Sequence, residues 1–174
     1  MLRNGRAART AKEARKQAKM SQEKFSMETH QSREAVSKQE TGGYRVQPQT
    51  AEYFAVKHNN PWVALEAAAE YAGWGMRKLD GPAVDLHRSS VKLKTIEELE
   101  EAIGAIEKVS VINQPFSIKS WERQEIEHSL EQSADAIYAL IHYMSIMCEE
   151  YQVPWHSVWE RHTNKLVANQ YVTR

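Results

Sequence analysis

The chain has 174 residues, in which 23 lysine and arginine side chains balance 23 aspartate and glutamate side chains. The balance is uneven, because residues 1–48 hold 11 of the basic and only 5 of the acidic side chains. A uniformly basic nucleic-acid-binding protein is therefore excluded, although the basic N-terminal segment by itself could contact phosphate groups. The length predicts a single globular domain that follows this segment.

The cysteine content and the hydropathy of the sequence indicate in which cellular compartment the protein is expected. Cys148 is the one cysteine of the sequence, so no disulfide can form within the chain and a cysteine-rich zinc site is excluded. No apolar stretch reaches the roughly 20 residues that a membrane-spanning helix needs. The first ten residues lack the apolar core of a secretory signal. We expect a soluble protein of the reducing cytoplasm that does not contact a membrane.

Residues 1–48 are poor in large apolar side chains and show no sustained helical stripe of them. So little apolar burial cannot offset the chain entropy that is lost when a segment becomes ordered. We therefore expect a basic, poorly structured N-terminal extension, with a docked oligomerisation arm as the alternative. The large apolar residues of this segment are Leu2, Met20, Phe25, Met27, Val36, Tyr44 and Val46.

The sequence from residue 49 onward predicts helices and no strands. A short helix is expected to start at Thr50, and a longer one covers residues 61–78. Asn60 can cap the longer helix, and Pro61 fits its first position, where the missing N–H costs nothing. Residues 82–94 are expected to be irregular or to contain a short turn of helix.

Three further helices follow. Thr95 and Glu98 have the spacing of a capping box, which predicts a helix from Thr95 to about residue 111. A long helix is expected over residues 121–150 and a last one over residues 154–168. Residues 49–174 are thus predicted to form an all-α domain that resembles a four-helix bundle. Apolar residues at spacings of three and four predict the buried stripes, which are Ile96, Leu99, Ile103 and Ile106, then Ile126, Leu130, Ala134, Ile137, Ile141, Met144 and Cys148.

Two of these helices also carry an acidic face. Glu97, Glu98 and Glu101 share an arc of about 100° on the first, and Glu131 and Asp135 lie one turn apart on the second. Acidic faces are most often simply solvated, but solvated faces usually interleave basic residues. Here like charges follow one another, without basic neighbours to relieve the repulsion. A divalent ion such as Mg²⁺ or Mn²⁺ between the two faces would relieve it.

Three segments resemble one family, the all-α nucleoside triphosphate pyrophosphohydrolases of the MazG and HisE-like group. IEELEEAI (96–103) resembles the family's EExxE motif. LEQSADAIYALIHYM (130–144) resembles its ExxD motif, with Asp135 at the aspartate and Gln132 at the glutamate, so that Glu131 takes over as the ligand. RHTNKL (161–166) is similar to the family's His-x-x-Asn-x-x-Lys type of ending. The resemblance covers roughly residues 93–168.

The resemblance implies a function. Two or more Mg²⁺ ions, with Mn²⁺ as a substitute, would bind a nucleoside triphosphate, and water would cleave it to the monophosphate and pyrophosphate. Glu98 and Glu101 would be catalytic, and the protein would be a homodimer or homotetramer with its site completed near subunit contacts. The implied metal ligands are Glu97, Glu98, Glu101, Glu131 and Asp135, and the substrate contacts are Arg161, Asn164, Lys165, Tyr138 and His142.

Two alternatives remain open. The chain could be a helical interaction protein whose acidic faces are solvated and whose basic N-terminal segment binds nucleic acid or a partner. It could also be a degenerate family member that binds nucleotides without cleaving them, because Gln132 stands at the glutamate position of the second motif.

Overall fold

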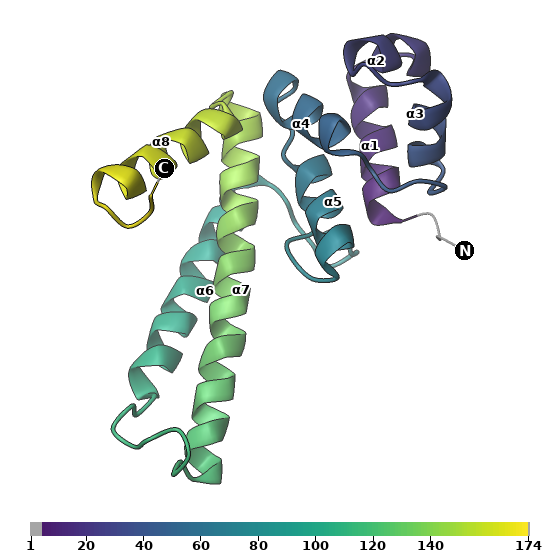
Figure 1. The fold of residues 1–174 in the computed structure, drawn as a ribbon. Helices are drawn as coiled ribbons and strands as arrows, with labels where there is room; N and C mark the ends of the chain where they lie inside the picture. The colour runs from purple at the N-terminus through teal and green to yellow at the C-terminus, as the bar shows by residue number, and fades with distance from the viewer. Residues whose placement is uncertain (1–4, 174) are drawn as a thin grey trace. The chain divides into compact units, whose positions relative to one another are not determined.

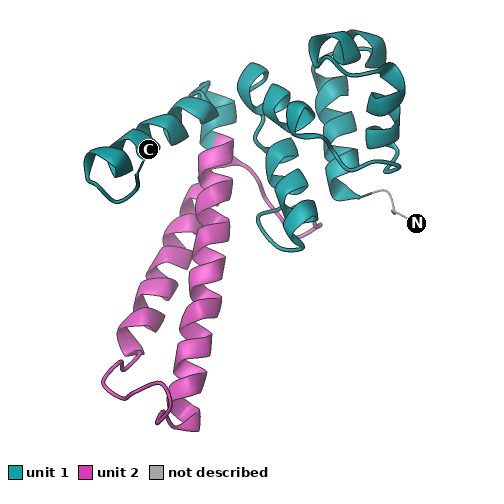
Figure 2. Cartoon of the chain, in the orientation of Figure 1, with its two compact units in different colours: residues 1–80, 147–174 teal, residues 81–146 magenta. Residues whose placement is uncertain are grey.

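The computed structural model describes residues 5–173, and every regular element within that range is a helix (Figure 1). The predicted all-α class is confirmed. The chain divides into two compact units, residues 1–80 with 147–174 and residues 81–146 (Figure 2). The helices are α1 (Arg6–Gln17), α2 (Gln22–Glu28), α3 (Arg33–Glu40), α4 (Pro48–Lys57), α5 (Trp62–Ala72), α6 (Arg88–Lys108), α7 (Ser120–Tyr151) and α8 (Trp155–Ala168).

The predicted boundary at residue 48 is wrong, because residues 5–48 form α1, α2 and α3 and contribute to the core of the first unit. The first four residues of the predicted extension lie outside the described range. Helix α1 buries Ala7, Ala11 and Ala14, a stripe of small residues that the search for large apolar side chains missed. Small side chains allow neighbouring helices to approach closely and to pack densely. The other core residues are Met20, Phe25, Val36, Val46, Phe54, Val63 and Ala67.

Helices α4 and α5 differ from the predicted ones at their ends. Gln47 is the N-cap of α4, so Thr50 lies inside the helix and is buried. Asn60 does cap α5, since its Oδ1 accepts the N–H of Trp62 at 3.1 Å. Helix α5 ends at Ala72 rather than at residue 78, because Gly73 adopts a left-handed φ of 77°, which stops a helix at little steric cost.

Within the first unit, Asn59 connects residues 1–80 with the C-terminal residues 147–174. Its Nδ2 donates to the carbonyls of Cys148 and Val153 at 2.7 and 3.0 Å, and its Oδ1 accepts the N–H of Trp155 at 2.7 Å. One amide side chain thus satisfies the backbone groups where α7 ends and α8 begins. The four helices that were expected to form one bundle are therefore divided, since α5 and α8 belong to the first unit and α6 to the second.

Helix α6 and most of α7 form an antiparallel hairpin in the second unit (Figure 2). Helix α6 begins at Arg88 with His87 as its N-cap, so the predicted capping box at Thr95 is wrong. Of the stretch 82–94 that was expected to be irregular, residues 82–87 are irregular and residues 88–94 are helical. Thr95 instead lies inside the helix and is buried. Its Oγ1 is 2.7 Å from the carbonyl of Val91 and 3.2 Å from that of Ala139 in α7, which joins the two helices.

Small side chains are buried in the hairpin, and much of the predicted apolar stripe is not. Ala102, Ala105 and Ala136 are each 5% exposed. Large apolar residues that were expected inside are between 44% and 63% exposed; they are Ile96, Ile103, Ile106, Leu130 and Ile137. Periodicity identified residues that share a face, but it did not reveal whether this chain covers that face. No helix within residues 5–173 has the length and apolarity needed to span a bilayer.

Candidate functional site

The two acidic motifs lie at the same position along the length of the α6–α7 hairpin. The contact between Thr95 and Ala139 defines the register of α6 against α7. Glu98 follows Thr95 by about one turn, and Asp135 precedes Ala139 by about one turn. The two helices are antiparallel (Figure 2), so positions 98 and 135 both fall on the loop side of that contact.

Glu98 is the most sheltered of the five predicted metal ligands. Its side chain is 15% exposed, against 56% for Glu97. Lys94 Nζ lies 2.9 Å from Glu98 Oε1 and 3.2 Å from Glu97 Oε2. The hydrogen bonds to Glu98 and then to Glu97 hold the pKa of Lys94 well above its usual range. The expectation that the acidic face has no basic neighbour is therefore wrong, and the spacing of Lys94, one turn before Glu98, was the sequence signal for it.

The remaining acidic residues are open to solvent. Glu101, Glu131 and Asp135 are exposed on the same two helices. Within residues 5–173, no three histidine, cysteine, aspartate or glutamate side chains lie close enough together to hold a metal ion. The hairpin thus carries carboxylate oxygens, which are the hard donors that Mg²⁺ prefers, without a closed metal cage in the single chain.

Two predicted substrate contacts lie on α7. His142 is only 3% exposed, and its ring stacks on Tyr138 with centroids 5.6 Å apart. The Nδ1 atom of His142 is 2.8 Å from the carbonyl of Tyr138. The structure therefore places His142 in a buried position with one ring nitrogen engaged by its own helix, and not on the open acidic face.

The other predicted substrate contacts lie on α8. Arg161, Asn164 and Lys165 are all exposed there. This helix belongs to the first unit, whereas the five carboxylates belong to the second. Within a single unit, the structure therefore places Glu98 and Asp135 at the same level of the hairpin, and the C-terminal motif belongs to the other unit.

Sequence reasoning missed a second polar surface, on α3. Val36, Gln39 and Glu40 are buried, while Arg33 and Glu34 of the same helix are exposed. The signal was a pair of serine N-caps. Ser21 accepts from the N–H of Lys24 and Ser32 from the N–H of Ala35, both at 3.0 Å, and they mark two short consecutive helices.

Comparison with known proteins finds no matching family model, no matching curated protein and no matching solved structure.

Proposed function

We propose that the protein is a Mg²⁺-dependent nucleoside triphosphate pyrophosphohydrolase that cleaves ribo- or deoxyribonucleoside triphosphates to monophosphates and pyrophosphate. The observation that carries the proposal is the hairpin register, in which the EExxE segment and Asp135 occupy the same level of two adjacent antiparallel helices. The resemblance of both segments to the motifs of the MazG-like family supports the assignment of the reaction.

The carboxylates of the hairpin supply suitable donors for the metal. Glu97, Glu98, Glu101, Glu131 and Asp135 would hold it, and the bound Mg²⁺ would supply charge neutralisation for the phosphates and activation of water. Glu98, the sheltered residue, accepts the proton of the attacking water, with Glu101 as a second catalytic carboxylate. Lys94 forms an ion pair with Glu98. Its ammonium group is then released to pair with a phosphate oxygen.

The active form is a homodimer or homotetramer. The exposed apolar residues of α6 and α7, among them Ile103 and Leu130, support this assembly. Burial of each large aliphatic side chain contributes about 1.5–3 kcal/mol, so several on one face favour a second copy. Pairing of two hairpins also brings a second set of carboxylates to the site.

A non-catalytic helical nucleotide-binding or interaction module is the alternative function. Its support is Gln132, which is half-buried on α7 at the position where the family's second motif has glutamate. An amide is a weaker ligand for Mg²⁺ than a carboxylate. Such a protein would bind triphosphates and leave them intact.

Product analysis tests the proposal. The purified full-length protein is incubated with each NTP and dNTP in the presence of Mg²⁺, and anion-exchange chromatography measures monophosphate and pyrophosphate. We expect Glu98→Gln and Asp135→Asn each to lower the rate by about 100-fold or more. The matched control is Glu107→Gln, which alters an exposed glutamate of α6 outside the motif.

The outcomes separate the two functions. Equal pyrophosphate release by wild type, Glu98→Gln and Asp135→Asn would remove the carboxylates from the mechanism. Calorimetric titration with Mg²⁺ provides a readout that does not depend on turnover, and the same two variants should bind the ion more weakly. Triphosphates that bind but are recovered unchanged would favour the non-catalytic alternative.

A further inference from the structure

Helices α2 and α3 form a compact pair joined by a turn of four residues, 29–32. His30 adopts a left-handed φ of 53° in this turn. The N–H of Gln31 donates to the carbonyl of Ser26 at 2.9 Å and closes the end of α2, and Ser32 caps α3. Two short helices in contact across such a turn constitute a helix-turn-helix arrangement.

A buried ion pair holds α3 against the two helices that precede it. Arg15 of α1 donates through Nη2 to Glu40 Oε2 at 2.9 Å, and the two side chains are only 10% and 4% exposed. Gln22 of α2 donates to the same carboxylate oxygen at 2.9 Å. The C-terminal end of α3 is therefore attached to both α1 and α2.

A second buried network holds α3 from the side of α4. Gln39 is 2% exposed, and its Oε1 accepts both the N–H of Gln47 at 2.8 Å and the hydroxyl of Thr50 at 2.9 Å. Its Nε2 donates to Gln31 Oε1 in the turn. Buried polar networks in which every member has a partner make the local structure rigid. The orientation of α3 is thus determined by its neighbours on three sides.

The outer face of α3 carries polar side chains and no large apolar one. Arg33 and Glu34 are exposed, and Ser37 and Lys38 are half-exposed. Lys38 Nζ lies 2.7 Å from Glu34 Oε1 and 3.3 Å from the Tyr44 hydroxyl. This face therefore presents hydroxyl, guanidinium, ammonium and carboxylate groups in one short row. Such groups can form hydrogen bonds with the donors and acceptors on the edges of bases, whereas an apolar stripe would favour a protein partner.

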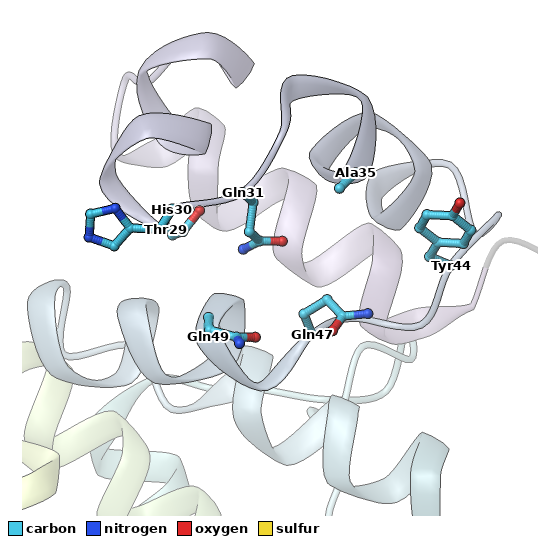
Figure 3. Close-up of a pocket in the computed structure, with 7 residues that line it drawn as sticks. All are labelled: Thr29, His30, Gln31, Ala35, Tyr44, Gln47 and Gln49. Carbon is cyan, nitrogen blue, oxygen red and sulfur yellow. The ribbon is translucent and has the colours of Figure 1, made fainter.

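A hollow lies beside α3, between the turn and the start of α4 (Figure 3). His30 lies at one end and Tyr44 at the other, with the amides of Gln31, Gln47 and Gln49 between them (Figure 3). Uncharged donors of this kind commonly contact phosphate oxygens at the edge of a groove-binding helix. The hollow therefore provides a surface on which a nucleic-acid backbone can lie next to α3.

The charge of this part of the chain is complementary to phosphate. Residues 1–48 hold 11 basic and 5 acidic side chains, and Lys24, Arg33 and Arg45 are exposed among them. Affinity for duplex DNA derives largely from neutralisation of its phosphates. The excess of positive charge comes from residues 1–20, which hold seven basic and one acidic side chain and precede the helix-turn-helix, whereas α2 and α3 themselves hold three basic and four acidic side chains.

We propose that residues 5–57 form a DNA-binding module that places α3 in the major groove of duplex DNA. The groove, about 12 Å wide, admits an α-helix, and in a helix-turn-helix the N-terminal residues of the second helix contact the bases. Arg33, at the first position of α3, binds the O6 and N7 of a guanine. Ser37 lies one turn further along the same face, and Lys38 and Tyr44 contact the adjoining backbone. This function is separate from the proposed hydrolysis.

Fluorescence anisotropy of the full-length protein tests the proposal. The probe is a labelled duplex of mixed sequence, about 30 base pairs or three helical turns long, followed by the duplexes enriched from a random pool. For the mixed duplex we expect a dissociation constant of about 1–100 µM that rises steeply with salt concentration. The enriched duplex should bind about 1000-fold more tightly or better.

Two variants and a matched control make the test specific. Arg33→Ala should weaken binding to the enriched duplex about tenfold or more and change binding to the mixed duplex little. Ser37→Glu, which places a negative charge on the outer face, should weaken both. Arg123→Ala removes an exposed arginine from the hairpin and should change neither. Thermal melting followed by circular dichroism verifies that all variants fold.

Three results would overturn the proposal: no binding to any duplex at low salt, wild-type affinity of both folded α3 variants, or tighter binding of single-stranded RNA than of duplex DNA. No nucleoside triphosphate is present in these measurements, so their outcome is independent of whether the protein is a hydrolase.

Discussion

At the scale of single residues, the buried pair of Arg15 and Glu40 determines where the N-terminal helices lie. Burial by itself would raise the pKa of Glu40, but the hydrogen bonds from Arg15 and Gln22 outweigh it, and the net pKa is lowered. The hydrogen bond to Glu40 raises the pKa of Arg15 in turn. Both groups are thus charged in the folded protein, in a position where either charge alone would be unfavourable.

Replacement of Glu40 by alanine leaves the guanidinium of Arg15 buried without its partner. We expect Glu40→Ala to lower the free energy of unfolding by about 3–5 kcal/mol, measured by urea denaturation of the full chain. Glu13→Ala, which alters an exposed glutamate of α1, serves as the control and should change stability little. A loss of less than about 1 kcal/mol, the range of exposed ion pairs, would contradict the role of the buried pair.

The same pair predicts a pH dependence. Because the folded-state pKa of Glu40 lies below the ordinary value of 4.5, its contribution to stability is complete above that value and is lost as the pH falls through the folded pKa. Wild type should therefore lose more stability than Glu40→Ala between pH 5 and 3. Parallel losses in the two proteins would assign acid unfolding to other groups.

At the scale of elements, small side chains determine which helices pack closely. Helix α1 contacts the core through Ala7, Ala11 and Ala14, and the hairpin buries Ala102, Ala105 and Ala136. Alanine buries little apolar area, so such a stripe stands out less in a sequence than a row of leucines. Its effect is geometric, because it lets two backbones come near each other.

An enlarged side chain in the alanine stripe of α1 tests this packing. Ala11 is 3% exposed, so Ala11→Leu has to push α1 away from the core and should cost about 1–3 kcal/mol. Lys12→Leu places the same side chain on the exposed neighbouring position and should be close to neutral. Melting temperatures that are equal for the two variants would show that α1 does not pack as described.

At the scale of the whole molecule, the exposed apolar residues of the hairpin are the basis of the proposed assembly. Ile103 and Leu130 are 55% and 63% exposed in the single chain. Contiguous exposed apolar patches on a soluble protein typically mark an interface with another molecule. The proposed assembly of two or more copies would cover these residues.

Charged substitutions on this face should dissociate the assembly without unfolding the chain. We expect the wild-type mass from light scattering to correspond to two or four chains, and that of Ile103→Glu with Leu130→Glu to fall to one. Lys108→Glu, an exposed change on α6 away from the apolar face, should leave the mass of the assembly unchanged. A monomeric wild type at micromolar concentration would contradict assembly through the hairpin.

The sequence by itself determined the all-α class, the extent of α7 and α8 to within a residue or two, and the cap of α5 by Asn60. These features depend on local chemistry, namely helical periodicity, proline at helix starts and amide capping. The two acidic motifs could also be recognised in the sequence, because each lies within a few consecutive turns of one helix.

Only the tertiary structure decided which faces of the helices are covered. Large residues such as Ile103 share a face by periodicity, yet they stay exposed, while small ones such as Ala11 and Ala102 are buried. Thr95 matched a capping pattern, but its hydroxyl contacts another helix 44 residues away. The role of Arg15 depends in the same way on Glu40, a distant partner. Burial and pairing depend on what lies opposite a residue in space, and local periodicity carries no information about that.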